Sequence, residues 1–322
     1  RMVLYKQALI ALSVFFSVGA YPDFLVDDAD MEAFIEKYQK EIDLGRKAAE
    51  EKFQEFALQA DRGAFTDINP HERPADAEFS PCPLINTMTY HGFLGNRNGR
   101  DIPVFEIPPM LEHVYSVQTG YGGVNLIINL GQTHLDPDGE THLLDIGRLW
   151  DRIPGNPGSI ERDSSIIFHD PFFGEETREE IDEYLLEGLF STSDDEYLTL
   201  EQLRKYTLAR LEDSVKNNPE FNACNIGTLA GHYMPYLLLD RDFIFYKVSK
   251  FNFENFWRNG KLPDDYSPST PQPVYSNRRE PWSQWRAKDF EYIRQLLEEH
   301  NMSCQQDHFW SALKGSSKVK DE

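Results

Sequence analysis

Residues Pro81 to Val104 read PCPLINTMTYHGFLGNRNGRDIPV, and this stretch decides the fold. It opens with a cysteine between two prolines. Pro83 is suited to the first turn of a helix, where its missing N–H costs nothing, so we predict that Cys82 lies at a helix N-terminus. The helix dipole and the backbone N–H groups of a first turn stabilise a thiolate. A thiolate held in this way serves as a haem ligand or as a nucleophile, and the residues alone do not separate the two roles.

Four further motifs follow this stretch. They are HLLDIGRL (His142 to Leu149), ERDSSIIFHDPFFGEE (Glu161 to Glu176), TLARLEDSVKNNPEFN (Thr207 to Asn222) and FWRNGKLPDDYSP (Phe256 to Pro268). The first stretch also contains, after its cysteine, Asn86, His91-Gly92 and the N-G-R-D-I loop of Asn98 to Ile102. Together these motifs resemble the fungal haem-thiolate peroxidases, which comprise the chloroperoxidases and the unspecific (aromatic) peroxygenases. The resemblance covers about Phe79 to Pro268.

This resemblance implies a mainly α fold: a single chloroperoxidase-like helical domain, here with an N-terminal helical extension. It also implies that the protein binds haem b and that Cys82 is the ligand to the iron. A thiolate ligand donates electron density to the iron and favours cleavage of the O–O bond. The expected oxidant is hydrogen peroxide, and the expected substrate is a small apolar or aromatic organic compound that is oxidised, oxygenated or halogenated.

The resemblance also implies a magnesium ion beside a haem propionate. Family members carry E-H-D or E-G-D followed two residues later by Ser. The matching ligands here are the Glu161 carboxylate, the backbone carbonyl of Arg162 and the Ser165 hydroxyl, all of them hard oxygen ligands of the kind that Mg²⁺ prefers. Arg162 departs from the family's His or Gly, and its guanidinium adds repulsion near a cation. Without the resemblance, E-x-D-S-S is typical of a surface polar turn.

The distal acid–base group is where this sequence departs most from the family. Family members use a Glu, but the corresponding segment, NIGTLAGHYMPYLLLD (Asn225 to Asp240), has no Glu. His232 occupies roughly the expected place. Because the unperturbed pKa of histidine is about 6.5, His232 can move protons near neutral pH. A single histidine in a mixed apolar stretch is also typical of a structural residue.

Two alternatives to a peroxidase therefore stay open. One is a haem-binding protein of the same fold that has lost peroxide cleavage and serves in binding or in biosynthetic isomerisation. The other is a secreted protein without haem, in which the P-C-P segment is structural. Peroxide turnover separates the first alternative from an enzyme, and an absorption spectrum separates the second.

The N-terminus has the pattern of a secretory signal peptide. Arg1 and Lys6 precede an apolar run from Ala8 to Val18, and the small residues Gly19 and Ala20 follow. This pattern predicts a signal peptide over residues 1–20 and a secreted protein. The run is too short to span a bilayer, which takes about 20 apolar residues, so we expect no membrane span after signal cleavage.

Periodicity predicts the organisation of the remaining chain. Apolar residues at helical spacing indicate an amphipathic helix from Asp30 to about Gln59, with an interruption at Gly45. Further helices are expected over 175–190, after a Thr199–Gln202 capping box, and over 284–300. The expected division is an N-terminal extension and linker over 21–78, a peroxidase core over 79–268 and a C-terminal extension over 269–322.

Composition limits the partners. The chain has 322 residues, with 32 Lys and Arg against 54 Asp and Glu and a formal net charge of −22. A strongly acidic protein does not suit nucleic acid, whose binding needs cations that neutralise phosphates. Of the three cysteines, Cys224 and Cys304 are candidates for a disulfide in an oxidising compartment. The oligomeric state is not predicted.

Several residues have a structural and a functional interpretation. His91 is expected to cap or pack beneath the haem. His134 and His142 flank DPDGE, which is typical of an Asp-Pro-Asp-Gly turn and lacks the full ligand pattern of a calcium loop. A set of phenylalanines is expected either to line an apolar channel or to pack in the core: Phe168, Phe172, Phe173 and Phe190.

Overall fold

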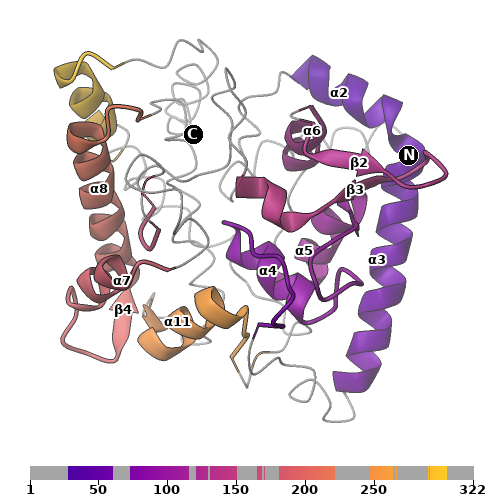
Figure 1. Ribbon diagram of the computed structural model, residues 1–322, viewed down its shortest axis with the longest axis horizontal. Helices are drawn as coiled ribbons and strands as arrows, with labels where there is room; N and C mark the ends of the chain where they lie inside the picture. The colour runs from indigo at the N-terminus through magenta and orange to yellow at the C-terminus, as the bar shows by residue number, and fades with distance from the viewer. Residues whose placement is uncertain are drawn as a thin grey trace, which may run out of the picture. The chain divides into compact units, whose positions relative to one another are not determined.

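The computed structural model describes residues 28–60, 73–115, 121–129, 131–150, 165–168, 170, 181–221, 247–263, 266, 289 and 291–302. Helices dominate the fold, as the resemblance implies, and the strands are short (Figure 1). The chain divides into two compact units, residues 1–151 with 254–270 and residues 152–253 with 271–322. The division after residue 151 falls inside the expected core of 79–268, whose limits stay a prediction.

The N-terminal extension forms two helices, α2 (Asp28–Lys37) and α3 (Gln39–Ala60). The helix is interrupted at Tyr38, so the predicted interruption at Gly45 is wrong. Gly45 lies inside α3, where an added Cβ would clash with the backbone oxygen of Phe105. The glycine therefore permits close packing of α3 on the 3-10 helix η2 (Val104–Glu106), and it does not break the helix.

The first unit has an apolar core around α4 (Pro83–Tyr90), which is buried along its whole length. Two more helices pack in this unit, α5 (Ile107–Tyr115) and α6 (Gly122–Asn129). The run from Val124 to Leu130 has no clear periodicity, and the structure assigns most of it to α6. A short apolar run has no polar face, so periodicity cannot separate a helix from a buried strand.

A small antiparallel sheet completes the first unit. The strands lie in the order β1 (Ile102–Pro103), β3 (His142–Leu144) and β2 (Thr133–Leu135). The 3-10 helix η3 (Ile146–Trp150) follows β3 in the chain. The sequence predicts no strand here, because strands of two or three residues are too short to show alternation.

The second unit has two principal helices, α7 (Glu183–Phe190) and α8 (Leu200–Asn217). Asp182 caps α7 by accepting hydrogen bonds from two backbone N–H groups. The predicted capping box is confirmed, because the Thr199 and Gln202 side chains each bond to the other residue's backbone at the start of α8. Residues 291–299 are helical, within the predicted 284–300.

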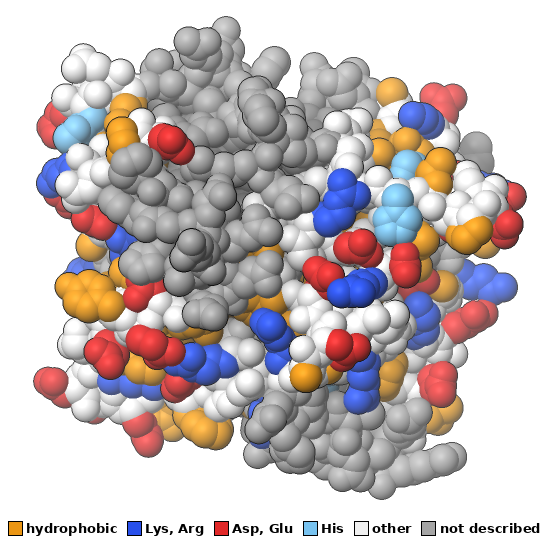
Figure 2. All heavy atoms as spheres, in the orientation of Figure 1, with side chains coloured by type: hydrophobic (Ala, Val, Ile, Leu, Met, Phe, Trp, Pro, Cys, Tyr) orange, Lys and Arg blue, Asp and Glu red, His pale blue; other side chains and the backbone are white. Residues whose placement is uncertain are grey.

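A two-stranded antiparallel sheet pairs β4 (Tyr197–Thr199) with β5 (Lys247–Ser249), and α11 (Lys250–Asn259) follows directly. Within the described ranges, no helix combines the length and the apolar character needed to cross a membrane. On the face drawn in Figure 2, the coloured acidic and basic side chains lie interspersed, and the basic ones do not gather into one patch.

Candidate functional site

Cys82 lies directly before the first residue of α4, as the sequence predicts. Its backbone is extended, with φ −97° and ψ 105°, and Pro83 is the first helical residue. A residue before proline is driven out of the helical region, and proline itself starts a helix without losing a hydrogen bond. Cys82 is half-buried and is not in a disulfide. The structure therefore places a thiol at the positive end of a helix.

The helix that begins directly after this thiol is buried. All eight residues of α4 are buried. Burial raises the pKa of Tyr115 well above its ordinary value, and the neighbouring Tyr266 and Cys82 raise the pKa further. Burial likewise raises the pKa of Tyr266. Both phenols are neutral at physiological pH, and the dipole of α4 favours a thiolate at its N-terminus.

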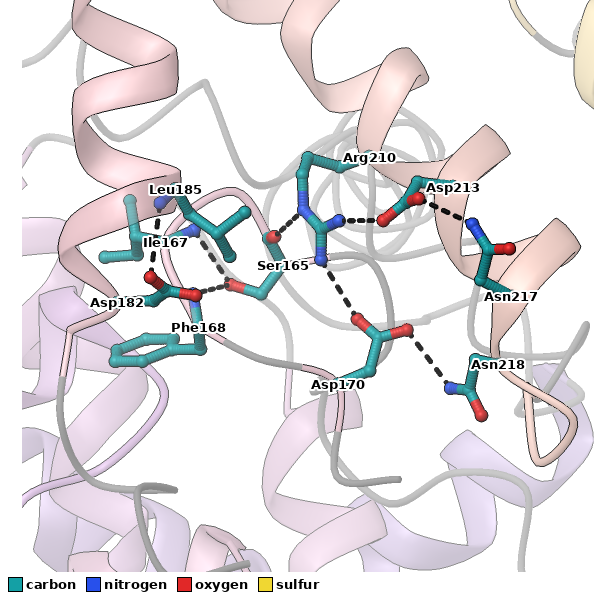
Figure 3. A network of polar contacts seen from close by, with 10 residues as sticks. All are labelled: Ser165, Ile167, Phe168, Asp170, Asp182, Leu185, Arg210, Asp213, Asn217 and Asn218. Carbon is teal, nitrogen blue, oxygen red and sulfur yellow. Dashed lines mark hydrogen bonds and ion pairs between the residues drawn. The ribbon is translucent and has the colours of Figure 1, made fainter. Parts of the chain in front are cut away.

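Ser165 lies in a second candidate site, in the loop before α7. Its side chain is buried, so the interpretation of this serine as part of a surface turn is wrong. Its hydroxyl oxygen accepts hydrogen bonds from the backbone N–H of Phe168 at 3.2 Å and of Ile167 at 3.4 Å. Its carbonyl oxygen accepts a hydrogen bond from Arg210 Nε at 3.0 Å (Figure 3).

A buried charged network supports this loop from α8 (Figure 3). Arg210 forms ion pairs with Asp170 at 3.2 Å and with Asp213 at 2.6 Å. Asn218 donates a further hydrogen bond to the second carboxylate oxygen of Asp170 at 3.1 Å. Because Asp170 is completely buried, these contacts replace the water that its charge has lost. The network fixes the Ser165 main chain relative to α8.

The other residues of the expected metal and acid–base sites lie outside the described residues. They are Glu161, Arg162 and His232. The structure therefore brings Ser165 together with Arg210 and Asp170, and the remaining ligands stay predictions. Cys224 and Cys304 also lie outside the described residues, so their pairing stays a prediction.

The described phenylalanines occupy packed positions. Phe168 is buried, and Phe190 packs edge-on against Phe253 with ring centroids 6.1 Å apart. Both arrangements agree with core packing. Phe172 and Phe173 lie outside the described residues.

The DPDGE segment forms the expected turn. Gly139 N–H bonds to the Asp136 carbonyl at 2.9 Å, and Glu140 N–H bonds to the Asp136 carboxylate at 2.7 Å. His134 instead pairs with Asp101 of the N-G-R-D-I loop at 2.8 Å. Asp145 accepts the Asp101 backbone N–H at 3.0 Å, so these three side chains join the loop to the small sheet.

Among the described residues, Asp101, His134 and Asp145 form the one cluster of three side chains of metal-ligating type. The sequence does not predict this cluster, because His134 and Asp145 are 33 and 44 residues from Asp101. The contacts between the three residues account for their placement without a metal ion.

His91 is buried at the end of α4. Its backbone N–H bonds to the Thr87 carbonyl at 3.0 Å, and its ring stacks on Phe93 with centroids 5.8 Å apart. Burial and the positive charges of Arg97 and Lys261 lower the pKa of His91 to about 3. This neutral, packed ring agrees with the structural role expected from the sequence.

A family described as "Peroxidase, family 2" matches residues 70–271. The chain belongs to this peroxidase family. Peroxidase family 2 is the fungal chloroperoxidase family, so the match supports the resemblance seen in the sequence and a function of peroxidase type. The matched range includes both Cys82 and Ser165. No curated protein matches the chain.

Proposed function

We propose that this member of peroxidase family 2 is a secreted haem-thiolate peroxidase or peroxygenase. It binds haem b through Cys82 and uses hydrogen peroxide to oxidise, oxygenate or halogenate small apolar or aromatic compounds. The observation that carries this proposal is the position of Cys82, between two prolines and at the N-terminus of the buried helix α4. A soft thiolate ligand suits haem iron, and the donor present therefore fits the group.

Bound haem supplies the oxidising chemistry, and the protein supplies its ligand and its surroundings. Cys82 would hold the iron through its thiolate sulfur. Its position before the first turn of α4 favours the thiolate form, and the packed side chains of α4 keep water from most of the helix. The neutral phenols of Tyr115 and Tyr266 add no opposing charge.

The proposed magnesium site uses the Glu161 carboxylate, the Arg162 carbonyl and the Ser165 hydroxyl. The Ser165 hydroxyl oxygen already accepts two backbone N–H bonds, and the longer one, from Ile167 at 3.4 Å, is the weaker. A bound cation would compete with these N–H groups for the hydroxyl oxygen. Arg210 holds the Ser165 carbonyl and so fixes the main chain at this ligand.

His232 is the proposed acid–base group. It takes a proton from one oxygen of hydrogen peroxide and returns it to the oxygen that leaves as water, which requires a group that titrates near the working pH. We expect His232→Ala to lower steady-state peroxidation by about 10²-fold or more, the scale for loss of a general acid–base. A variant as active as the wild type would remove His232 from the mechanism.

The absorption spectrum of the haem-loaded full chain tests the central assignment. We expect the ferrous carbon monoxide complex of the wild type to show the red-shifted Soret band of thiolate ligation. Cys82→His is expected to lose this band while a histidine-ligated spectrum replaces it. A thiolate band that persists in Cys82→His would exclude Cys82 as the ligand. Thiolate ligation in a protein without peroxide turnover would instead favour the haem-binding alternative.

A further inference from the structure

A tripeptide just after the last described helix has no part in the proposed reaction. It reads Asn301-Met302-Ser303, which is the N-x-[ST] pattern, without proline in the middle, that accepts an N-linked glycan. The pattern occurs once in the 322 residues. It lies outside residues 70–271, the range that matches peroxidase family 2, so the family match does not account for it.

The helix that precedes this tripeptide, residues 291–299, packs on α8 in the second unit (Figure 1). The Tyr292 hydroxyl donates a hydrogen bond to the Glu212 carboxylate of α8 at 2.9 Å. Just before the helix, Asp289 forms an ion pair with Arg204 of α8. The helix also has three buried apolar residues: Ile293, Leu296 and Leu297. The end of this helix therefore has a defined position in its unit.

The helix ends in a turn in which Asn301 is the central residue. Asn301 has a φ of 54°, in the left-handed region. Its backbone N–H donates to the Glu298 carbonyl at 3.1 Å, and the Met302 N–H donates to the Leu297 carbonyl at 2.8 Å. These two hydrogen bonds form a Schellman motif, whose left-handed residue is usually glycine and sometimes asparagine. The chain therefore turns away from the helix axis at Asn301.

Asn301 is exposed at this turn, in contrast to the buried face of the helix. A glycan is bulky and polar, so an acceptor must lie where the sugar extends into water. A sugar on the Asn301 amide meets this condition, because it displaces no buried side chain. Asn217, near the end of α8, is likewise exposed, but no hydroxyl follows it two residues later.

The turn alone offers a structural explanation for an asparagine at this position. Asparagine adopts the left-handed conformation more readily than most residues that carry a side chain. This explanation does not require the hydroxyl of Ser303, whereas glycosylation does. The two roles of Asn301 can therefore be separated by substitution.

We propose that Asn301 is an N-glycosylation site and that its glycan extends from the end of the helix over residues 291–299. This inference rests on the secretion included in the proposed function. The donor is an oligosaccharide bound to a lipid diphosphate. The Asn301 Nδ2 forms a bond to C1 of the first sugar, and the bond from this carbon to the diphosphate oxygen breaks. The amide nitrogen loses one proton, and the lipid diphosphate leaves with the electron pair.

Three substitutions separate the acceptor from the turn. Ser303→Ala keeps Asn301 and removes the hydroxyl of the pattern. Ser303→Thr is the matched control, because it changes the same residue and retains the pattern. Asn301→Gly removes the amide and keeps a residue that suits the left-handed turn. Thermal unfolding of each full-length variant, after enzymatic removal of N-glycans, confirms that it is folded.

The full chain is produced in a yeast, once with its own N-terminus and once behind the signal peptide of another secreted protein. Protein from the cells and from the medium is treated with an amidase that converts glycosylated asparagine to aspartate in water enriched in heavy oxygen. Mass spectrometry then locates the label. We expect label at residue 301 in the wild type and in Ser303→Thr, and its complete loss in Ser303→Ala. Asn217 should stay unlabelled, and Asn301→Gly should show no change of gel mobility on amidase treatment.

The foreign signal peptide makes the test independent of secretion by the chain's own N-terminus. An unlabelled Asn301 in wild-type chains from which the foreign signal has been cleaved would overturn the proposal. A label that persists in Ser303→Ala would also overturn it, because the label would then report spontaneous deamidation. If the chain with its own N-terminus stays in the cytosol, the proposed secretion fails, and the label in the chain with the foreign signal still decides whether Asn301 is an acceptor.

Discussion

Acidification should destabilise this protein through His91, and the size of the effect follows from its burial. The pKa of His91 is lowered from 6.5 to about 3 by desolvation first and by Arg97 and Lys261 next, while the Gly260 backbone partly offsets them. In the unfolded chain the ring takes a proton near pH 6.5, and in the folded protein it stays neutral down to about pH 3. The unfolded state therefore binds more protons in this window, and stability is lost as the pH falls through it.

The magnitude can be worked out from the two pKa values. One pKa unit corresponds to about 1.4 kcal/mol, so between pH 7 and pH 5 the single histidine should cost about 2 kcal/mol of unfolding free energy. His91→Phe keeps an aromatic ring beside Phe93 and removes the titration. The difference between wild type and variant isolates His91 from the many carboxylates that also titrate on acidification.

Urea unfolding followed by far-UV circular dichroism at pH 7, 6 and 5 measures this difference. Between pH 7 and pH 5, we expect the wild type to lose about 2 kcal/mol more unfolding free energy than His91→Phe loses. The reasoning is refuted if the two proteins lose the same free energy between pH 7 and pH 5, since an accessible or ion-paired His91 would then be indicated.

Three further predictions concern packing, a buried acid and the metal site. Gly45→Ala should destabilise by about 1 to 3 kcal/mol in thermal or urea unfolding, because its Cβ meets the Phe105 backbone; a gain in stability, as helix propensity alone predicts, would contradict the close approach. Burial raises the pKa of Glu106, and Lys52 partly offsets this effect, so Lys52→Met should raise the pKa of Glu106 further. The stability of this variant should therefore fall as the pH rises above about 4.5, by roughly 1 to 3 kcal/mol at pH 7, and match the wild type below that pH. Glu161→Gln should lower the content of magnesium, about one per haem in the wild type by elemental analysis; equal metal and haem in both proteins would place the site elsewhere.

The sequence predicts well the structural features that depend only on neighbouring residues, such as the ends of helices. Pro83 predicts the start of α4 because the effect of a proline acts within one turn, and the structure confirms it. The Thr199–Gln202 capping box likewise acts over three residues and is confirmed. Gly45 shows the limit of this reasoning. Its low helix propensity predicts an interruption, but the glycine is required by the backbone of Phe105, which is distant in the sequence.

The same distinction between adjacent residues and distant contacts applies to the candidate site. The identity of the thiol and the helix end that stabilises it can be predicted from a few adjacent letters. The side chains that hydrogen-bond to the segment before this thiol cannot be predicted in this way. Trp150 is 71 residues from Phe79, and no local sequence pattern shows that its N–H donates to the Phe79 carbonyl. The same holds for Arg210 and Asp170, which are 40 residues apart and appear in the sequence as two ordinary charges. A buried hydrogen bond or ion pair joins two positions that only the fold brings together, so the residues that orient this site became apparent only in the structure.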